Sequence, residues 1–557
     1  MQLNGSDILM EVLIEQEVDT IFGYPGGAVL HIYDALYKYK DKIRHIMPVD
    51  ECGAGHAADG YARASGKTGV VLATSGPGAT NLVTALATAY MDSIPVVAIT
   101  GNVPTNLIGK DSFQEVYITG ITMPITKHNF VVRDVKELAD TVRQAFLIAN
   151  QGRKGPVLVD IPKDISGAFC DFERKAKKQP KKYRIDSSLQ KNIQDVAELI
   201  NNSKRPLVYF GGGTRDYTGI LREFLQNTNI PCVHTIMATG NISYDEPFYV
   251  GLIGMHGTVT SNTIINEADL ILAIGTRFSD RVALNTSKFG GEAKKVHIDI
   301  DQSEVNKNVK VDYELIGDLE EILKAFLTLK CKANSKEWLS YIKDMKEKEE
   351  ERLKNKFAPK EFSPKNIMDT INEVTKSEAI CVTDVGQHQM WAVQYTKHRF
   401  PRSFLTSGGL GTMGFAYGAA LGAKIAKPEK TVIQITGDGS FYMNLNEVAT
   451  AVEYSLPIIS IILNNNTLGM VRQWQSSFYE NRYSSTDMNK KMDYVKVAQG
   501  FYAKGFSCKN LNEFKEAFSE ALKEKNTPVW IECIIDKDEK VLPMIPAGGN
   551  VENIIVD

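Results

Sequence analysis

The sequence predicts an α/β protein of three domains, each a parallel sheet flanked by helices. Short apolar runs such as TGVVLATSG, ADLILAIGT and TVIQITGDG alternate with longer amphipathic stretches, which is typical of parallel strands buried on both faces and joined by helices. Most of these runs end in Gly, Asp or Asn, where ligands bind in open α/β sheets. The chain has 557 residues, too many for one core, so several domains are expected.

Charge and linker composition divide the chain. We expect a first domain at 1–167, a linker at 168–190, a central domain at 191–330, a second linker at 331–364 and a last domain at 365–557. The first linker is predicted from seven Lys or Arg in the eleven positions 174–184. The second is predicted from a highly charged run that begins as an exposed helix and then crosses a Pro-containing stretch.

The first and last domains share a faint repeat. In each, a Gly-rich helix leads into a strand, a Gly turn and a second strand that an Ile-Pro or Leu-Pro step opens. Gly76 precedes Pro95 by 19 residues, and Gly437 precedes Pro457 by 20. This spacing indicates two related domains.

Composition excludes several classes of partner. Lys and Arg number 64 and Asp and Glu 67, a net charge of −3, which is too even for a general binder of nucleic acid or anionic membranes. The seven scattered cysteines form no Cys-x-x-Cys pair, so a reducing compartment and no zinc site are expected. No stretch has the length and apolarity of a membrane span or a secretion leader, which predicts a cytoplasmic protein.

The clearest chemical signal follows two neighbouring predicted strands. Asp438 stands between Gly437 and Gly439, and Asn465 comes 27 residues later at the end of the next strand. Their oxygens, with a backbone carbonyl near Thr467, suit octahedral Mg²⁺ that also binds phosphate oxygens. A bare Gly-Asp-Gly is most often a simple turn, but the spacing and the strand context favour a metal and diphosphate site.

With this motif the sequence resembles the thiamine-diphosphate enzymes. The segments SGPGATN, DSFQE, TKHN, GPVLVDIPKDI, GMHG, GTRFSDR, GGLGTMGF, LGMVRQW and VLPMIPAGG follow in the same order as in the acetohydroxyacid (acetolactate) synthase catalytic subunits. The resemblance covers practically the whole chain. It implies an enzyme that decarboxylates pyruvate and ligates the remaining two-carbon unit to a second 2-keto acid, pyruvate or 2-ketobutyrate, as in branched-chain amino acid biosynthesis.

The resemblance also implies roles for single residues. Glu51 would exchange a proton with the cofactor's pyrimidine ring, and Met413 would force the cofactor into its bent shape. The reaction pocket would be lined by Phe113, Gln114 and Lys163, and Trp474 would shape the space for the acceptor. The remaining predicted thiamine-diphosphate contacts are Gly386, Gln387, His388, Gln389, Gly411, Gly437, Asp438, Gly439, Ser440, Asn465, Thr467, Leu468, Gly469 and Met470, of which Asp438, Asn465 and Thr467 would hold the metal.

For the central domain the resemblance implies a structural, non-redox FAD. The triple glycine alone is a weak dinucleotide signal, but FGGGT, GMHG and GTRFSDR occur in the family's order. The predicted FAD contacts are Gly211, Gly212, Gly213, Arg215, Met255, His256, Gly275, Thr276, Arg277, Asp299 and Asp301. Arginine is suited to a diphosphate because its planar group donates two parallel hydrogen bonds.

The chain departs from the family pattern beside Glu51. The family has His-Glu-Gln there, whereas this chain has Asp50-Glu51-Cys52. A carboxylate at Asp50 would repel a keto acid if it faced the substrate, so Asp50 and Cys52 are candidate substrate residues. Tyr442 stands where a polar, non-aromatic residue is expected. The sequence alone leaves open whether these differences are natural or engineered.

Alternatives and partners also remain open at this stage. A divergent carboligase or decarboxylase that prefers aldehydes, a flavin oxidase and a catalytically silent cofactor-binding or regulatory subunit share the scaffold. In the family, Glu51 and Asp438 would come from different subunits, which implies a homodimer or homotetramer. A regulatory small subunit is possible.

Overall fold

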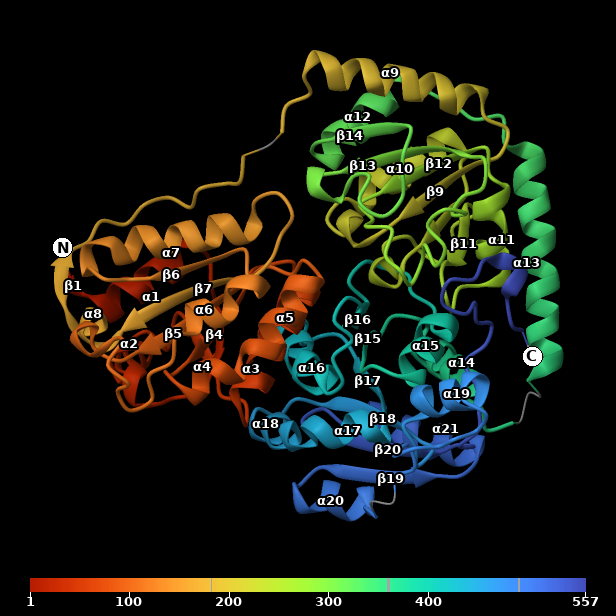
Figure 1. Cartoon of the computed structure of the whole chain (residues 1–557). Coiled ribbons are helices and arrows are strands. Elements are labelled where there is room, and N and C mark those ends of the chain that lie inside the picture. Colours follow the sequence, from red (N-terminus) through yellow and green to blue (C-terminus); the bar gives the residue numbers. More distant parts are fainter. Residues whose placement is uncertain (182, 358–360, 489–490, 557) are drawn as a thin grey trace.

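The structure is a computed structural model that describes residues 1–181, 183–357, 361–488 and 491–556. Three six-stranded parallel sheets with helices on their faces form the N-terminal, central and C-terminal domains (Figure 1). The predicted α/β class is thus confirmed. The N-terminal domain lies on the left of Figure 1, the central domain at the upper right and the C-terminal domain below it.

The N-terminal sheet has the strand order β3-β2-β4-β5-β7-β6. Its strands are short and almost wholly apolar in the middle of the sheet, where helices cover both faces. A separate antiparallel pair, β1 (Gln2–Asn4) with β8 (Phe169–Asp171), closes the domain. The elements are β2 (Thr20–Gly23), β3 (Arg44–Ile46), β4 (Gly69–Ala73), β5 (Val96–Asn102), β6 (His128–Val131), β7 (Val157–Pro162), α1 (Gly5–Glu15), α2 (Leu30–Lys38), α3 (Glu51–Ser65), α4 (Pro77–Asn81), α5 (Val83–Met91), α6 (Ile118–Thr122), α7 (Val135–Asn150) and α8 (Lys163–Gly167).

The C-terminal sheet has the order β16-β15-β17-β18-β20-β19. With the strands of each domain numbered along the chain, both outer sheets read 2-1-3-4-6-5, so the predicted kinship of the outer domains extends to their topology. The elements are α14 (Pro364–Thr375), β15 (Ile380–Thr383), α15 (Gln387–Tyr395), β16 (Phe404–Thr406), α16 (Phe415–Ala426), β17 (Val432–Gly437), α17 (Asp438–Asn444), α18 (Val448–Glu453), β18 (Ile458–Asn464), α19 (Gly469–Phe478), α20 (Tyr494–Gly500), β19 (Lys504–Cys508), α21 (Leu511–Lys523) and β20 (Val529–Ile534).

The central sheet has a different order, β11-β10-β9-β12-β13-β14, which reads 3-2-1-4-5-6. This is the order of dinucleotide-binding α/β sheets, whose ligand lies where the order reverses, here between β9 and β12. The elements are α9 (Ser187–Asn202), β9 (Pro206–Phe210), α10 (Thr218–Thr228), β10 (Cys232–His234), β11 (Tyr249–Leu252), α11 (Val259–Glu267), β12 (Leu270–Ile274), β13 (Lys294–Asp299), β14 (Tyr313–Ile316), α12 (Leu319–Leu329) and α13 (Lys336–Lys356).

The two outer domains share one apolar core through α3 and α16, which lie side by side in Figure 1. Small residues allow this close approach. A Cβ at Gly60 would collide with the backbone of Ala419, and one at Gly422 would collide with the backbone of Ala57. Since Glu51 is the first residue of α3, this packing fixes the predicted catalytic carboxyl relative to the C-terminal domain.

Both predicted linkers contain regular secondary structure. The first linker begins with β8, and its residues Gln179, Pro180, Lys181 and Tyr183 line a cavity described below. The second contains the expected helix, α13, although Trp338 and Ile342 of that helix are buried. Residues 358–360, part of its predicted crossing, lie outside the described residues. The exact domain boundaries stay predictions.

No helix in the described part of the chain is long and apolar enough to cross a membrane.

Candidate active site

The C-terminal sheet brings the Gly-Asp-Gly motif and the asparagine loop to one edge. β17 ends at Gly437, and β18, its neighbour in the sheet, ends at Asn464. Asp438 begins α17, and backbone amides of Gly439 and Asn466 lie against its carboxyl group. The side-chain oxygen of Asn465 accepts a hydrogen bond from the Thr467 amide at 3.3 Å. Asp438, Asn465 and Thr467 are therefore neighbours.

These oxygens fit a hard cation. Burial raises the pKa of Asp438 to about 7, because a charged carboxylate without a counter-ion is costly in a dry site. A bound cation would offset that cost. Among the described residues, no three or more His, Cys, Asp or Glu side chains lie together in a way that could hold a metal ion. One carboxylate with amide and carbonyl oxygens is a donor set that Mg²⁺ accepts.

The site also has a cradle for phosphate. Gly386 precedes α15 with φ of 150°, and a Cβ at Gly437 would lie 2.7 Å from Nδ1 of His388. Burial lowers the pKa of His388 to about 3, so its ring is neutral. Its Nε2 is buried and lacks a hydrogen-bond partner within the described chain. A phosphate oxygen would supply such a partner.

The side chains of the two glutamines that flank His388 form hydrogen bonds within the protein and do not point into open space. Gln387 donates to Gln473 Oε1 and to the carbonyl of Glu539, both at 2.9 Å. Gln389 donates to Thr406 Oγ1 at 2.7 Å. Ser440 donates to the carbonyl of Val385 at 3.0 Å. These predicted contact residues thus hold the loops around the cradle.

The segment 407–413 approaches the cradle from β16. The Met413 methyl group lies 3.8 Å from the position of a Cβ on Gly439, so the wedge residue and the Gly-Asp-Gly turn are close. Gly411 has φ of 75°, a conformation that favours glycine. Gly469, which follows Leu468 and begins α19, also lies close to this site, because a Cβ there would collide with the side chain of Gln387. The N-terminus of α19 is therefore packed against the predicted diphosphate site.

Glu51 lies at the equivalent edge of the N-terminal domain. The residue is 9% exposed, and its carboxylate accepts a hydrogen bond from Asn81 Nδ2 at 2.9 Å. Asn81 belongs to the SGPGATN motif but was not singled out, because an exposed asparagine carries no chemical signature. Across the described residues, no hydrogen bond or ion pair joins Glu51 to Asp438 or Asn465.

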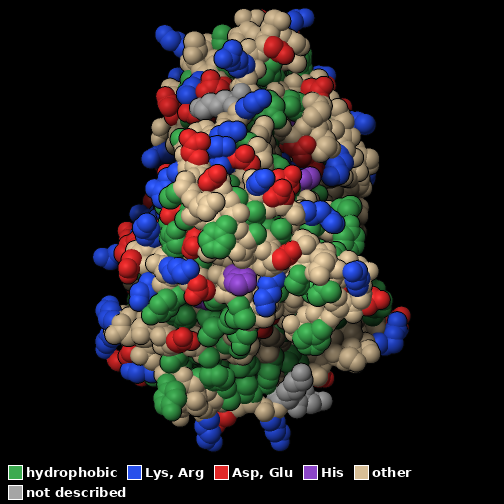
Figure 2. Space-filling model, turned by 90° about the vertical axis from the view of Figure 1, so that its left-hand side faces the viewer, with side chains coloured by type: hydrophobic (Ala, Val, Ile, Leu, Met, Phe, Trp, Pro, Cys, Tyr) green, Lys and Arg blue, Asp and Glu red, His purple; other side chains and the backbone are tan. Residues whose placement is uncertain are grey.

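Of the other predicted pocket residues of this domain, Phe113 and Gln114 are exposed and Lys163 is half-buried. The Phe113 side chain is 89% exposed, and the backbone of Gln114 lies against Gly76 of SGPGATN. Lys163 starts α8 directly after β7. Large apolar side chains remain uncovered after β2 and after β5, namely Leu30 after β2 and Leu107, Phe113, Tyr117, Ile121 and Met123 after β5. Figure 2, which views the left-hand side of Figure 1, shows hydrophobic side chains gathered over the lower half of that face.

The unusual neighbours of Glu51 have structural partners. The Asp50 carboxylate caps α3 by accepting a hydrogen bond from the Gly53 amide at 2.8 Å. Burial raises the pKa of the Cys52 thiol to about 12, so the thiol is neutral. Tyr442 packs against Tyr494, with ring centroids 6.4 Å apart. The geometry gives Asp50 a capping role; a substrate role for Asp50 and Cys52 stays a prediction.

A cavity of about 2110 Å³ opens between the central domain and the other two. It lies at the order reversal of the central sheet. Gly213 and Gly275 touch there, since a Cβ on Gly213 would come 2.9 Å from Gly275 Cα. His256 contributes a buried Nδ1 that has no partner within the described residues. The predicted FAD contacts on its wall are Gly211, Gly212, Gly213, Arg215, Met255, His256, Gly275, Thr276, Arg277 and Asp299.

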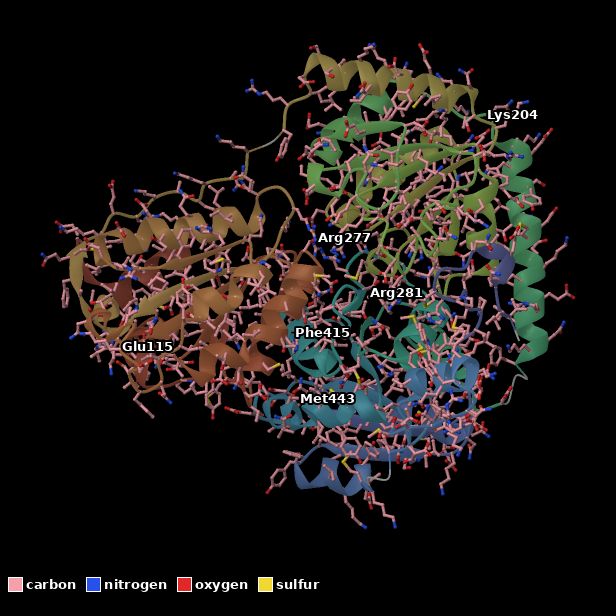
Figure 3. The ribbon with its side chains drawn as sticks, in the orientation of Figure 1. Glu115, Lys204, Arg277, Arg281, Phe415 and Met443 are labelled. Atoms are coloured by element: carbon pink, nitrogen blue, oxygen red, sulfur yellow. The ribbon has the colours of Figure 1, made fainter. Side chains whose placement is uncertain are left out.

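Asp301 does not line this cavity. Its carboxylate accepts from the Ser303 amide at 3.0 Å and lies 3.6 Å from Arg153. Arg281 lines the wall although only its motif, GTRFSDR, was noted. Figure 3 shows Arg277 and Arg281 on the side of the central domain that faces the other domains.

The same cavity reaches the C-terminal domain. Gly386, Gln389, Gly411, Met470 and Trp474 belong to its wall. The Trp474 ring meets Phe478 edge-on at 5.6 Å. The predicted flavin and acceptor regions therefore open into one space.

The fold and the site together fit a protein that binds a diphosphate cofactor. Family models match three segments, described as the N-terminal TPP binding domain (residues 3–121), the central domain (193–326) and the C-terminal TPP binding domain (384–533) of thiamine pyrophosphate enzymes.

Curated relatives narrow the class. The chain is 44% identical to the probable acetolactate synthase large subunit of Methanocaldococcus jannaschii, an alignment that covers 99% of this chain and 95% of the relative. It is 42% identical to the large subunit of Corynebacterium glutamicum (99% and 90%) and 40% identical to the mitochondrial catalytic subunit of Saccharomyces cerevisiae (99% and 84%). The chain belongs to the acetolactate synthase large-subunit family of thiamine pyrophosphate enzymes.

Proposed function

We propose that this chain is a thiamine-diphosphate-dependent acetolactate synthase. It takes pyruvate, releases CO₂ and ligates the two-carbon unit to pyruvate or 2-ketobutyrate, giving 2-acetolactate or 2-aceto-2-hydroxybutyrate. The observation that carries the proposal is the meeting of Asp438, Asn465 and the orphaned Nε2 of His388 at one sheet edge. The names of the relatives supply the reaction.

Thiamine diphosphate, when bound, supplies a nucleophilic carbon and an electron sink for the decarboxylation. The protein's part is to bind and to move protons. Asp438, the Asn465 amide and the Thr467 carbonyl would hold Mg²⁺, and His388 would donate to a phosphate oxygen. The Asn81 amide fixes one carboxylate oxygen of Glu51, so that Glu51 can hold and release a proton in a defined direction.

The substrate space would be shaped by Met413, Met470 and Trp474 from the C-terminal domain. Phe113, Gln114 and Lys163 would complete it from an N-terminal domain. Because no hydrogen bond or ion pair among the described residues joins Glu51 to Asp438 or Asn465, and Phe113 is exposed, we propose that a second copy completes each site. A homodimer is the smallest assembly that does so, and a tetramer or an added regulatory subunit is compatible with it.

We further propose FAD as the ligand of the central-domain cavity. The strand order, the touching glycines and the unpartnered His256 Nδ1 support a dinucleotide there. Arg215 and Arg277 would meet the diphosphate, and the flavin would not change redox state in the main reaction. The cytoplasmic location remains a prediction from the sequence.

Product identification tests the proposal. Purified protein would be given pyruvate, thiamine diphosphate, Mg²⁺ and FAD, and acetolactate and CO₂ are expected. Acetaldehyde as the main product would favour a decarboxylase, and stoichiometric oxygen uptake would favour an oxidase. Absence of CO₂ release would indicate a silent subunit.

A further inference from the structure

The segment 407–413 has neither helix nor strand, although it carries Gly411 and Met413. Such a segment needs outside contacts to keep one conformation, because its own backbone groups do not pair with one another. Its contacts come largely from the N-terminal domain of the same chain. The residue at their centre is Asp92, which follows α5.

The Asp92 carboxylate binds two successive amides of this segment. Oδ1 accepts from the Gly409 amide at 2.7 Å, and Oδ2 accepts from the Gly408 amide at 3.2 Å. The approach is close enough that any side chain at Gly409 would force Asp92 or Met91 to shift. A Cβ on Gly409 would lie 2.8 Å from Asp92 Oδ1 and 2.9 Å from Met91.

Arg63 of α3 holds Asp92 and the same segment together. Its Nη2 lies 2.8 Å from Asp92 Oδ2, and its Nη1 donates to the Thr406 carbonyl at 2.8 Å. Its Nε pairs with Asp59. The side chains of Arg63, Asp59 and Asp92 are 3%, 0% and 0% exposed, so water neither screens nor replaces these bonds.

Two further contacts surround this ion group. Thr88 and Thr412 share a hydrogen bond of 2.7 Å between their hydroxyls. The Arg63 guanidinium lies 5.1 Å from the centre of the Phe415 ring, and Figure 3 shows Phe415 beside the N-terminal domain. The segment is thus fixed to the N-terminal domain on both sides of Gly411.

We propose that Asp92, with Arg63, is a positioning residue for cofactor binding: it sets the segment 407–413 so that Gly411 and Met413 stand beside the Gly-Asp-Gly turn. This inference rests on the proposed thiamine-diphosphate site. The N-terminal domain would then have two roles. It carries Glu51, and it also holds the segment 407–413 of its own chain in one conformation. Nothing in the motifs of the sequence marks Asp92.

The test compares Asp92→Ala with Asp59→Asn. Both disturb the same buried arginine, but only Asp92 touches the segment. Thiamine diphosphate with Mg²⁺ would be titrated calorimetrically into each apo variant, and hydrogen exchange of peptides covering 404–414 would be followed by mass spectrometry. We expect about tenfold or greater loss of affinity and faster exchange for Asp92→Ala, with a clearly smaller change in both readouts for Asp59→Asn, which keeps both bonds from Asp92 to the segment.

Equal affinity and equal exchange in the two variants would overturn the inference. If Asp92→Ala does not fold, Thr88→Val carries the test, because at nearly constant shape it removes the bond to Thr412 and, besides it, only a bond to the Thr84 carbonyl within α5. Weakened affinity is then expected, and wild-type affinity with wild-type exchange would count against the inference. A wild-type protein that does not bind thiamine diphosphate would contradict the proposed function instead, while the exchange comparison would still be readable.

Discussion

The orientation of the Glu51 carboxyl group depends on residues that surround it in the fold. The sequence offers a glutamate before an Ala-Gly-rich helix, and the structure buries it at the first turn of α3 with one oxygen held by Asn81. A buried acid with one fixed oxygen has one defined direction for proton exchange. Its chemistry can be tested without disturbing the helix, because Gln has nearly the same shape.

We expect Glu51→Gln to retain thiamine-diphosphate binding and to lose about 10²-fold in turnover, the size usual for a positioned acid-base group. Steady-state rates and a calorimetric titration of the cofactor check both parts. Asn81→Ala is the companion variant and should show a smaller loss, since the carboxyl group remains. Near-normal turnover of Glu51→Gln would remove Glu51 from the mechanism.

The predicted role of Trp474 in acceptor choice can also be tested by a single substitution. It lines the large cavity and packs edge-on against Phe478. One methylene in an apolar pocket is worth about 1 to 3 kcal/mol, so a rigid aromatic wall can distinguish 2-ketobutyrate from pyruvate. Trp474→Leu should reduce this discrimination in a competition between the two acceptors. An unchanged product ratio would assign Trp474 to packing only.

At the scale of the element, the N-terminus of α3 depends on two carboxyl groups. Asp50 caps the helix, while Glu447 of the C-terminal domain accepts from the Val49 amide at 3.2 Å and from Thr450 at 2.7 Å. Gly53 allows this approach, because a Cβ there would collide with Glu447. Two acids thus lie at the positive end of one helix dipole.

Asp50→Ala should lower the free energy of unfolding by about 1 kcal/mol, because an N-cap acceptor is lost. Asp50→Asn keeps the acceptor and should stay close to wild type. Urea unfolding followed by circular dichroism measures the difference. Restoring the family's neighbours with Asp50→His and Cys52→Gln should leave the ratio of acetolactate to aldehyde unchanged if Asp50 is a cap, whereas a changed ratio would support the substrate role.

Burial, reinforced by Asp50, raises the pKa of Glu447 to about 7 from its usual 4.5. Between these values the folded protein binds the proton and the unfolded chain releases it. Stability therefore falls as pH rises through this window, by at most about 1.4 kcal/mol per pH unit. Glu447→Gln lacks this dependence. The difference between the urea midpoint of the variant and that of the wild type should therefore shift in favour of the variant as pH rises from about 5 to about 8. A constant difference across this range would contradict the assignment.

For the whole molecule, the decisive feature is that Glu51 and Asp438 belong to different domains, with no hydrogen bond or ion pair between them among the described residues. Glu51 is buried at the start of α3 in the domain that carries the uncovered apolar side chains, and Asp438 lies beside Asn465 at the carboxyl edge of the C-terminal sheet. Apolar patches of this kind mark interaction surfaces. A second copy that covers the patch would bring each Glu51 to its partner's Asp438.

Mixing two inactive variants tests this arrangement. Glu51→Gln and Asp438→Asn should each be inactive, and a co-refolded or co-expressed equimolar mixture should regain about one quarter of wild-type activity, since half the dimers are mixed and each has one intact site. Sedimentation would confirm that the mixture is dimeric. No recovery in a dimeric mixture would place both residues in the same chain's site.

The sequence by itself determined the local features of this protein. Continuous apolar runs indicated the buried parallel strands, and the Gly-Asp-Gly turn and Asn465, predicted to follow neighbouring strands, do lie at one edge of the C-terminal sheet. These are readable because strand burial and turn geometry depend on residues close in the chain.

Only the tertiary structure decided which distant segments meet. It gave the matching order of the outer sheets and brought the first linker to the wall of the large cavity. It left Asp301 outside the wall of that cavity and set Asp92 against Gly408 and Gly409. These outcomes depend on strand order and on the packing of α3 against α16, which join residues hundreds of positions apart, and no local pattern encodes such contacts.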